Sequence, residues 1–300
     1  MYLIENEFLT VCISPKGAEL ISITHKKQGI NYVWDADPTF WGKSSPVLFP
    51  IVGGLKDNTY FFEGKAYTLP RHGFAREATF ELEEHADEGI CLLLRSNEDT
   101  LKVYPFEFEL RLIYELYGNV LSLTYHVTNT GQNDLYFSVG GHPAFAVPLE
   151  KGLTYDDYFL EFEEDEYLNR WPLNAEGLVL DEAIPIFPDL AFDEDSDPTT
   201  SKIIPLSKAL FYQDALVFKQ LASKTITLKS EKSKHALTFD FAGFPYLGIW
   251  AAKNANFVCI EPWCGIADSA SHNQELSQKE GINQLPAGEI FERAWAVKLT

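Results

Sequence analysis

Three short stretches of this 300-residue chain place ionisable side chains where strands are expected to meet turns. Residues 70–76 read PRHGFAR and offer one imidazole together with two guanidinium groups. Residues 140–145 read GGHPAF, in which two glycines permit a sharp turn and the proline restricts the backbone of the histidine. Residues 259–263 read CIEPW, in which an apolar strand ends on a glutamate. Burial at such a strand end raises the pKa of a carboxyl group, because it disfavours the charged form.

His142 and Glu261 are therefore candidates for a general acid–base pair. Both also have a structural interpretation, since a histidine in such a turn often only hydrogen-bonds the backbone and a strand-end glutamate is more often a solvated charge. His72, His142 and Glu261 have the residue types of a two-histidine, one-carboxylate metal site, but no local spacing supports one, and we expect no metal. These residues alone indicate a β-rich protein with a candidate acid–base site.

The elements that must position these side chains have the pattern of strands. Residues 105–116 alternate apolar and polar side chains, Gly118 and Asn119 form a favoured hairpin loop, and the alternation resumes over residues 121–127. Further strands are expected at residues 10–14, 79–83, 90–95, 135–139, 216–219, 225–228, 236–241, 246–251, 257–260 and 293–299. Residues 271–280 are the only helix candidate. Many strands without interleaved helices favour an all-β antiparallel sandwich over a βαβ fold.

We expect a single domain over residues 1–300, because all-β sandwiches commonly reach this size as one unit. Residues 169–205 differ from the rest, being rich in proline and aspartate and lacking sustained periodicity. They are predicted to form a long irregular excursion on the surface, of the kind that often lies beside a site.

The net charge of −20, from 44 acidic and 24 basic residues, argues against nucleic-acid and membrane partners and suits a neutral substrate. The N-terminal residues lack a signal-peptide pattern, and no apolar run approaches the roughly 20 residues of a membrane span. Four cysteines without CxxC spacing indicate reduced thiols, so a cytoplasmic location is expected. No nucleotide-binding or serine-hydrolase motif appears.

RHGFAR, GGHPAF and EPWCGIADS, in this order, resemble the aldose 1-epimerase (galactose mutarotase-like) family, and most closely its LacX-like branch. Hexose-6-phosphate epimerases are relatives in the same group. The resemblance extends from residues 15–19 to residues 285–288 and includes SPVLFPIVGG at 45–54 and FPYLGIW at 244–250. It implies a large antiparallel β-sandwich, the galactose mutarotase-like supersandwich, with a sugar cleft on one sheet. The implied activity is that of a cofactor-free isomerase of carbohydrate metabolism.

The resemblance also implies roles for individual residues. His142 would be the general acid, Glu261 the general base, and His72 would bind near the ring oxygen of the sugar. The residues implied to hold sugar hydroxyls are Asp214, Arg71 and Arg76. During ring opening a base takes the anomeric proton while an acid protonates the ring oxygen, and reclosure after rotation exposes the other face. Because the protons balance, no cofactor is expected.

One position departs from the family's pattern, because Gly54 stands where a VGR segment would carry arginine. Lys56 or Arg71 is the candidate replacement, although lysine lacks the bidentate fork of arginine. This departure affects the expected substrate more than the reaction type. The aromatic residues considered for stacking on the sugar are Phe244, Trp250 and Trp263. In a chain with 14% aromatic residues, any one of them is more often part of the core.

Three alternatives remain beside a hexose mutarotase. The first is a hexose-6-phosphate 1-epimerase. The second is a non-catalytic carbohydrate-binding or sugar-sensing protein, since a shared fold does not guarantee activity. The third is a glycoside hydrolase using Glu261 and Asp214 as paired carboxylates, which would leave two histidines without a role. In each case the partner is a small-molecule sugar, with or without a phosphate; the sequence leaves the oligomeric state undefined.

Overall fold

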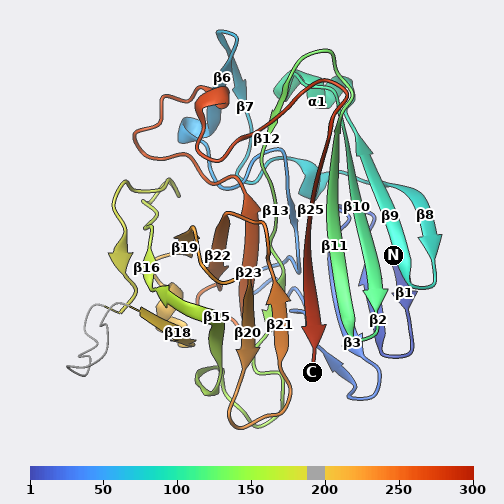
Figure 1. The fold of residues 1–300 in the computed structure, drawn as a ribbon, viewed down its shortest axis with the longest axis vertical. Helices are drawn as coiled ribbons and strands as arrows, with labels where there is room; N and C mark the ends of the chain where they lie inside the picture. The colour runs from blue at the N-terminus through green and yellow to red at the C-terminus, as the bar shows by residue number, and fades with distance from the viewer. Residues whose placement is uncertain (188–199) are drawn as a thin grey trace.

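The computed structural model describes residues 1–187 and 200–300, and its largest element is a nine-stranded antiparallel sheet (Figure 1). In spatial order its strands are β18 (Thr200–Pro205), β15 (Phe159–Tyr167), β20 (Thr225–Lys229), β21 (Leu237–Asp240), β25 (Ile290–Leu299), β11 (Val120–Asn129), β10 (Phe108–Tyr117), β9 (Gly89–Arg95) and β8 (Glu81–Ala86). The predicted hairpin is confirmed: β10 and β11 pair up to Tyr117↔Val120, and Gly118 takes the left-handed φ of +59°.

Two smaller sheets accompany it. The six-stranded sheet contains β19 (Leu216–Lys219), β22 (Tyr246–Trp250), β23 (Phe257–Cys264), β13 (Val139–Gly141) and β5 (Val47–Leu48), with β14 (Ala144–Ala146) paired to β23. The four-stranded sheet contains β1 (Tyr2–Glu5), β2 (Leu9–Ile13), β3 (Leu20–His25) and β4 (Ile30–Asn31). The two-stranded pairs are β6 (Thr59–Phe62) with β7 (Lys65–Thr68), β12 (Leu135–Phe137) with β24 (Asn283–Leu285), and β16 (Asn169–Arg170) with β17 (Ile184–Pro185).

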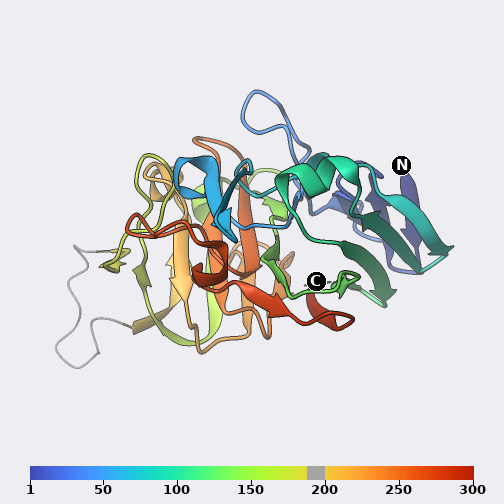
Figure 2. The same cartoon turned by 90° about the horizontal axis from the view of Figure 1, so that it is seen from above.

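The two smaller sheets pack on the large one, as Figures 1 and 2 show. Phe145 of β14 lies edge-on to Phe239 of β21, with ring centroids 5.8 Å apart, which joins the six-stranded sheet to the β15–β25 half. At the other half, the Tyr114 hydroxyl of β10 donates to the carbonyl of Ala18, between β2 and β3, at 2.7 Å. The prediction of an all-β antiparallel sandwich is confirmed.

The alternation in sequence corresponds to a sheet with one covered and one solvated face. On β10, Leu110 and Leu112 are fully buried between the sheets. Arg111, between them in sequence, points outward and binds Glu83 at 2.6 Å. A period-two pattern of this kind arises because an antiparallel sheet buries only one of its faces.

The helix predicted over residues 271–280 is wrong, because only the 3₁₀ turn η5 (Leu276–Gln278) forms there. Gln274 has a left-handed φ of +68°, and its side-chain amide donates to the carbonyls of Lys56 and Thr59 at 2.8 and 3.1 Å. This contact with a distant segment holds the backbone outside the helical region. Among the described residues the only α-helix is α1 (Glu98–Val103), and none is long and apolar enough to cross a membrane. The other 3₁₀ turns are η1 (Lys56–Asn58), η2 (Ala75–Glu77), η3 (Tyr155–Asp157) and η4 (Lys208–Phe211).

The irregular excursion predicted at 169–205 lies partly outside the described residues, which omit 188–199. Its described portion contains β16 and β17, and its last residues form the edge strand β18. Two backbone bonds hold the earlier portion over the six-stranded sheet: Trp171 donates to Val217, and Val179 donates to Asp268, both at 2.9 Å. This portion therefore forms one wall of the space above β22 and β23.

Candidate active site

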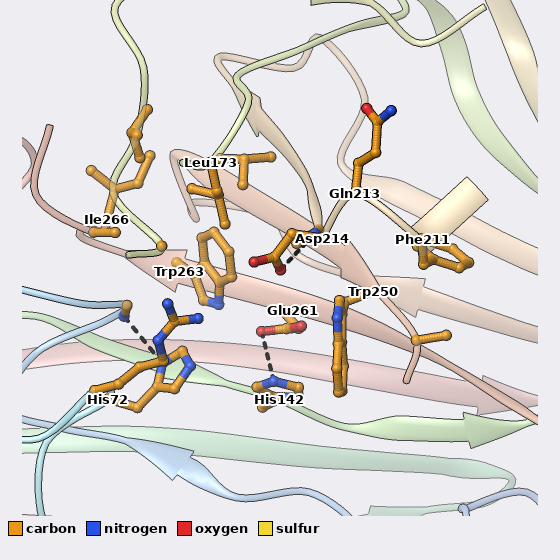
Figure 3. A pocket seen from close by; sticks show the side chains of 18 of the residues that line it. His72, His142, Leu173, Phe211, Gln213, Asp214, Trp250, Glu261, Trp263 and Ile266 are labelled. Carbon is orange, nitrogen blue, oxygen red and sulfur yellow. Dashed lines mark hydrogen bonds and ion pairs between the residues drawn. The ribbon is translucent and has the colours of Figure 1, made fainter. Parts of the chain in front are cut away.

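A cavity of about 650 Å³ lies over one face of the six-stranded sheet, above strands β22 and β23. Figure 3 shows most of the side chains that line it. Every residue that the sequence assigned to the site lines this cavity, namely Arg71, His72, Arg76, His142, Asp214 and Glu261. The three motif stretches therefore meet in one place, with the segment around Asp214 on the opposite wall.

Glu261 and His142 face each other at the floor of the cavity, with Nε2 of His142 3.3 Å from Oε2 of Glu261 (Figure 3). The predicted strand end at Glu261 is wrong, because β23 continues to Cys264, where its last residues pair with β22 and β13. Glu261 therefore lies in the middle of β23 and is 2% exposed; His142 lies between β13 and β14 and is 7% exposed. The glycine before this turn is required by packing, because a Cβ on Gly140 would lie 2.8 Å from both the Pro262 carbonyl and the Trp263 ring. The chain runs alongside β23, to which both β13 and β14 pair, and this brings the histidine to the glutamate.

Burial shifts the pKa values of this pair in opposite directions. It lowers the pKa of His142 to about 3, and the positive charge of Arg76 adds to this effect. Burial raises the pKa of Glu261 well above its usual value; Arg76 opposes that rise, and the Asp214 carboxylate adds to it. Both groups are therefore driven towards their neutral forms, and the pair holds one exchangeable proton that either partner can carry.

His72 presents one ring nitrogen to the backbone. Its Nδ1 accepts a hydrogen bond from the backbone N–H of Gly53 at 3.1 Å. Burial, the adjacent ionisable imidazole of His142 and the positive charges of Arg76 and Arg71 hold its pKa well below the usual range, so the ring is neutral. Because Nδ1 is an acceptor, the proton of the neutral ring must be on Nε2. His72 has a left-handed φ of +67°, which marks a constrained turn.

Asp214 and the two arginines approach from the walls. Asp214 has a left-handed φ of +85°, and its Oδ1 accepts from the N–H of Ala215 at 2.8 Å, leaving Oδ2 without a hydrogen bond in the described structure. Arg76 comes from η2, partly buried, whereas Arg71 is exposed at the rim and donates to the Glu176 carbonyl at 3.2 Å. A carboxylate and two guanidinium groups around one cavity can accept from and donate to several hydroxyl groups.

Of the aromatic residues considered for stacking, Trp250 and Trp263 line the cavity and Phe244 does not. Phe244 is buried between the sheets, edge-on to Tyr125 at 6.4 Å, so it is a core residue and does not stack on a ligand in the cavity. Trp263 lies over Gly248, whose lack of a side chain leaves room for the indole ring. Trp41 and Phe211 also line the cavity. Sequence reasoning missed both because they lie in segments without periodicity or motif.

The two-histidine, one-carboxylate metal site considered from the sequence would use His72, His142 and Glu261. The structure instead brings Cys259 to that pair, with one ligand-type atom from each of Cys259, His142 and Glu261 within 4.8 Å of one another. His72 already uses Nδ1 to accept from Gly53. The site is thus defined by the close acid–base pair of His142 and Glu261, with the thiol of Cys259 next to it.

The fold and this cavity define a galactose mutarotase-like β-sandwich protein. A galactose mutarotase related enzyme from Lactobacillus acidophilus superposes with a TM-score of 0.89 at 35% identity, covering 100% of this chain and 97% of that one. A galactose mutarotase-like protein from Lactobacillus casei ATCC 334 superposes with a TM-score of 0.91 at 32% identity, covering 100% of both chains. The present chain is similar to these two structures across its whole length.

The chain belongs to the aldose 1-epimerase family, because residues 1–280 match the family model described as Aldose 1-epimerase. The plasmid-encoded protein LacX of Lactococcus lactis subsp. lactis is 35% identical over 295 residues, covering 94% of this chain and 93% of that protein. The resemblance drawn from the three motifs, including its LacX-like branch, is confirmed. Membership in the family supports an isomerase-type enzyme with a sugar substrate.

Proposed function

We propose that this protein is a cytoplasmic aldose 1-epimerase, a mutarotase that interconverts the α and β anomers of a hexose within a single domain spanning residues 1–300. The observation that carries this proposal is the 3.3 Å contact between His142 Nε2 and Glu261 Oε2 at the floor of the cavity. Ring opening needs one group that takes a proton and one that gives a proton within reach of the same carbon atom, and this pair supplies both.

In the proposed reaction Glu261 takes the proton of the anomeric hydroxyl while His142 protonates the ring oxygen. The C1–O5 bond then breaks, C1 rotates about C1–C2, and reclosure with the two roles reversed gives the other anomer. The buried pair begins with one exchangeable proton, and the ionised form that the reaction uses contains the same number of protons. Arg76 favours that form at Glu261, because its charge lowers the pKa of this carboxyl.

The walls of the cavity would hold the sugar while C1 remains free to rotate. Asp214 has a free carboxylate oxygen to accept from hydroxyl groups, and His72 directs an Nε2–H at the ring oxygen. Trp250 and Trp263 offer aromatic faces, on which the apolar faces of a pyranose pack well.

Arg71 is the better replacement for the arginine expected at position 54. Gly54 lies next to the loop at residues 176–178, since a Cβ there would be 3.7 Å from the Glu176 carbonyl. Arg71 donates to this same carbonyl and lines the cavity. Lys56 instead directs its ammonium group to the His272 carbonyl at 3.4 Å and does not line the cavity.

Polarimetry on freshly dissolved α-glucose, α-galactose and glucose 6-phosphate tests the proposal. We expect the wild-type protein to accelerate relaxation of at least one of these sugars, and the order of rates then distinguishes a hexose from a hexose phosphate substrate. Calorimetric titration of the same sugars is the companion measurement. Binding without acceleration of any of them would contradict the proposal and favour a carbohydrate-binding protein.

A further inference from the structure

The imidazole of His142 is packed between two tryptophans. Trp41 stacks on its face, with ring centroids 4.9 Å apart and an interplanar angle of 28°. Trp250 meets the same imidazole edge-on at 5.6 Å, and the two indoles lie at 76° to each other. Trp250 belongs to β22, whereas Trp41 belongs to the loop at residues 35–43, to which neither a motif nor the proposed reaction assigns a role.

This loop is fastened to the first residue of β14, the strand that follows His142. Ala144, two residues after the histidine, binds the residues on either side of the loop. Its N–H donates to the Ser44 carbonyl and its carbonyl accepts from the Trp34 N–H, each at 2.9 Å. The buried carboxylate of Glu19 accepts from the N–H of Ser44 at 2.7 Å. From the residue just before the loop, the Trp34 indole donates to the Trp41 carbonyl at 3.0 Å. Trp41 is therefore held in place relative to His142.

No hydrogen bond from another residue to Nδ1, the second ring nitrogen, orients the imidazole of His142. Nδ1 is buried and has no hydrogen-bond partner among the other described residues, so the backbone of His142 itself is the polar group left to it. Catalytic histidines usually have this nitrogen bound to a carboxylate or carbonyl, which fixes the ring, and the last side-chain torsion of histidine is otherwise broad. Aromatic packing is the contact that remains to hold Nε2 towards Glu261.

We propose that Trp41 is a positioning residue, whose indole fixes the plane of the His142 imidazole and excludes water from its face. This inference rests on the acid–base role proposed for His142. The titratable groups around the imidazole are Glu261 and Cys259 of β23, together with His72 and Arg76. Trp41 contributes an uncharged ring to this set, so its effect comes through orientation and desolvation.

The test compares three variants of the full-length protein: Trp41→Leu, Trp41→Phe and the matched control Phe40→Leu. Phe40 is the adjacent residue of the same loop, 43% exposed, and does not line the cavity. The measurements are kcat and KM for mutarotation, and the pKa of His142 from NMR titration of isotope-labelled imidazole resonances.

We expect Trp41→Leu to lower kcat about 10-fold and to change KM by less than about 2-fold. This loss of kcat is smaller than that expected when general acid–base catalysis is removed altogether. The pKa of His142 should rise towards its usual value, because water reaches the ring. Trp41→Phe should recover most of kcat, and Phe40→Leu should match wild type. An unchanged kcat and His142 pKa in Trp41→Leu, or an equal loss in Phe40→Leu, would overturn the inference. If wild type catalyses no mutarotation, the proposed function fails, and the NMR comparison alone decides the role of Trp41.

Discussion

The backbone N–H of Gly53 donates to Nδ1 of His72 at 3.1 Å, so the neutral imidazole of His72 carries its proton on Nε2 and acts as a donor towards the cavity. The tautomer of a site residue is thus set by one backbone bond. Because this bond occupies Nδ1 and leaves Nε2 as the donor, the contributions of the two ring nitrogens of His72 to activity can be separated by substitution.

Replacing His72 by glutamine or by asparagine should have unequal effects. The amide nitrogen of glutamine reaches the position of Nε2 and can still donate, whereas asparagine mimics only Nδ1. We expect His72→Asn to lower kcat/KM about 100-fold and His72→Gln about 10-fold, which steady-state polarimetry can measure. Asparagine retaining as much activity as glutamine would mean that the Nε2 donor does not contribute.

Neutralising Arg76 should move the pH profile of kcat/KM in one direction. Arg76 lowers the pKa values of both His142 and Glu261, so its loss raises both. Activity falls on the acid side as the pair takes a second proton, and on the alkaline side as it loses its last one. In Arg76→Met both limbs should therefore lie at higher pH than in wild type. Limbs that stay in place, or that move apart, would contradict this coupling.

A buried ion pair supports the loop that carries Gly53. Lys279 Nζ lies 2.6 Å from Asp268 Oδ1, and both side chains are 1% exposed. Oδ2 of Asp268 accepts from the N–H of Lys56 at 2.9 Å, and its own N–H donates to the Gly54 carbonyl at 2.9 Å. The loop beside His72 is thus held by a carboxylate whose close partner is a buried lysine, with Nε2 of His272 farther away, 4.0 Å from the same oxygen.

Lys279→Met should consequently lower the free energy of unfolding by about 3 kcal/mol, because it leaves the buried charge of Asp268 uncompensated. Urea denaturation measures this directly. The double variant Asp268→Asn, Lys279→Met is the matched control and should recover part of the loss, since it removes the uncompensated charge. Equal stability of wild type and Lys279→Met would show that the pair contributes little.

The parts of the molecule that the sequence predicts well are those governed by local pattern. The alternation of β10 and β11 and the hairpin between them follow from one-sided burial and from a two-residue turn. His72, His142 and Glu261 were identified because Gly/Pro turns and strand ends mark places where a side chain can be held rigidly, and because three short motifs resemble a family. The structure places them together in one cavity.

The parts that the sequence did not predict depend on contacts between distant segments. Gln274 bonds the carbonyls of Lys56 and Thr59, and this removes the helix that local composition favoured. Trp41 reaches His142 only because Ala144 binds both ends of the loop around it. Phe244 was only one of three aromatic candidates for stacking on the sugar, and its packing against Tyr125 between the sheets separates it from the two tryptophans that line the cavity. No period or motif contains this information.

The most direct test of the acid–base account is the rate of anomer interconversion by Glu261→Gln beside wild type, on whichever aldose wild type accelerates. Glutamine keeps the size and hydrogen bonding of the side chain but cannot take a proton. Glu84→Gln is the matched control, because Glu84 is an exposed strand residue far from the cavity walls. We expect a loss of at least about 100-fold in Glu261→Gln with sugar binding retained, and wild-type rates in Glu84→Gln. Wild-type rates in Glu261→Gln would contradict the proposal that the His142–Glu261 pair performs the reaction.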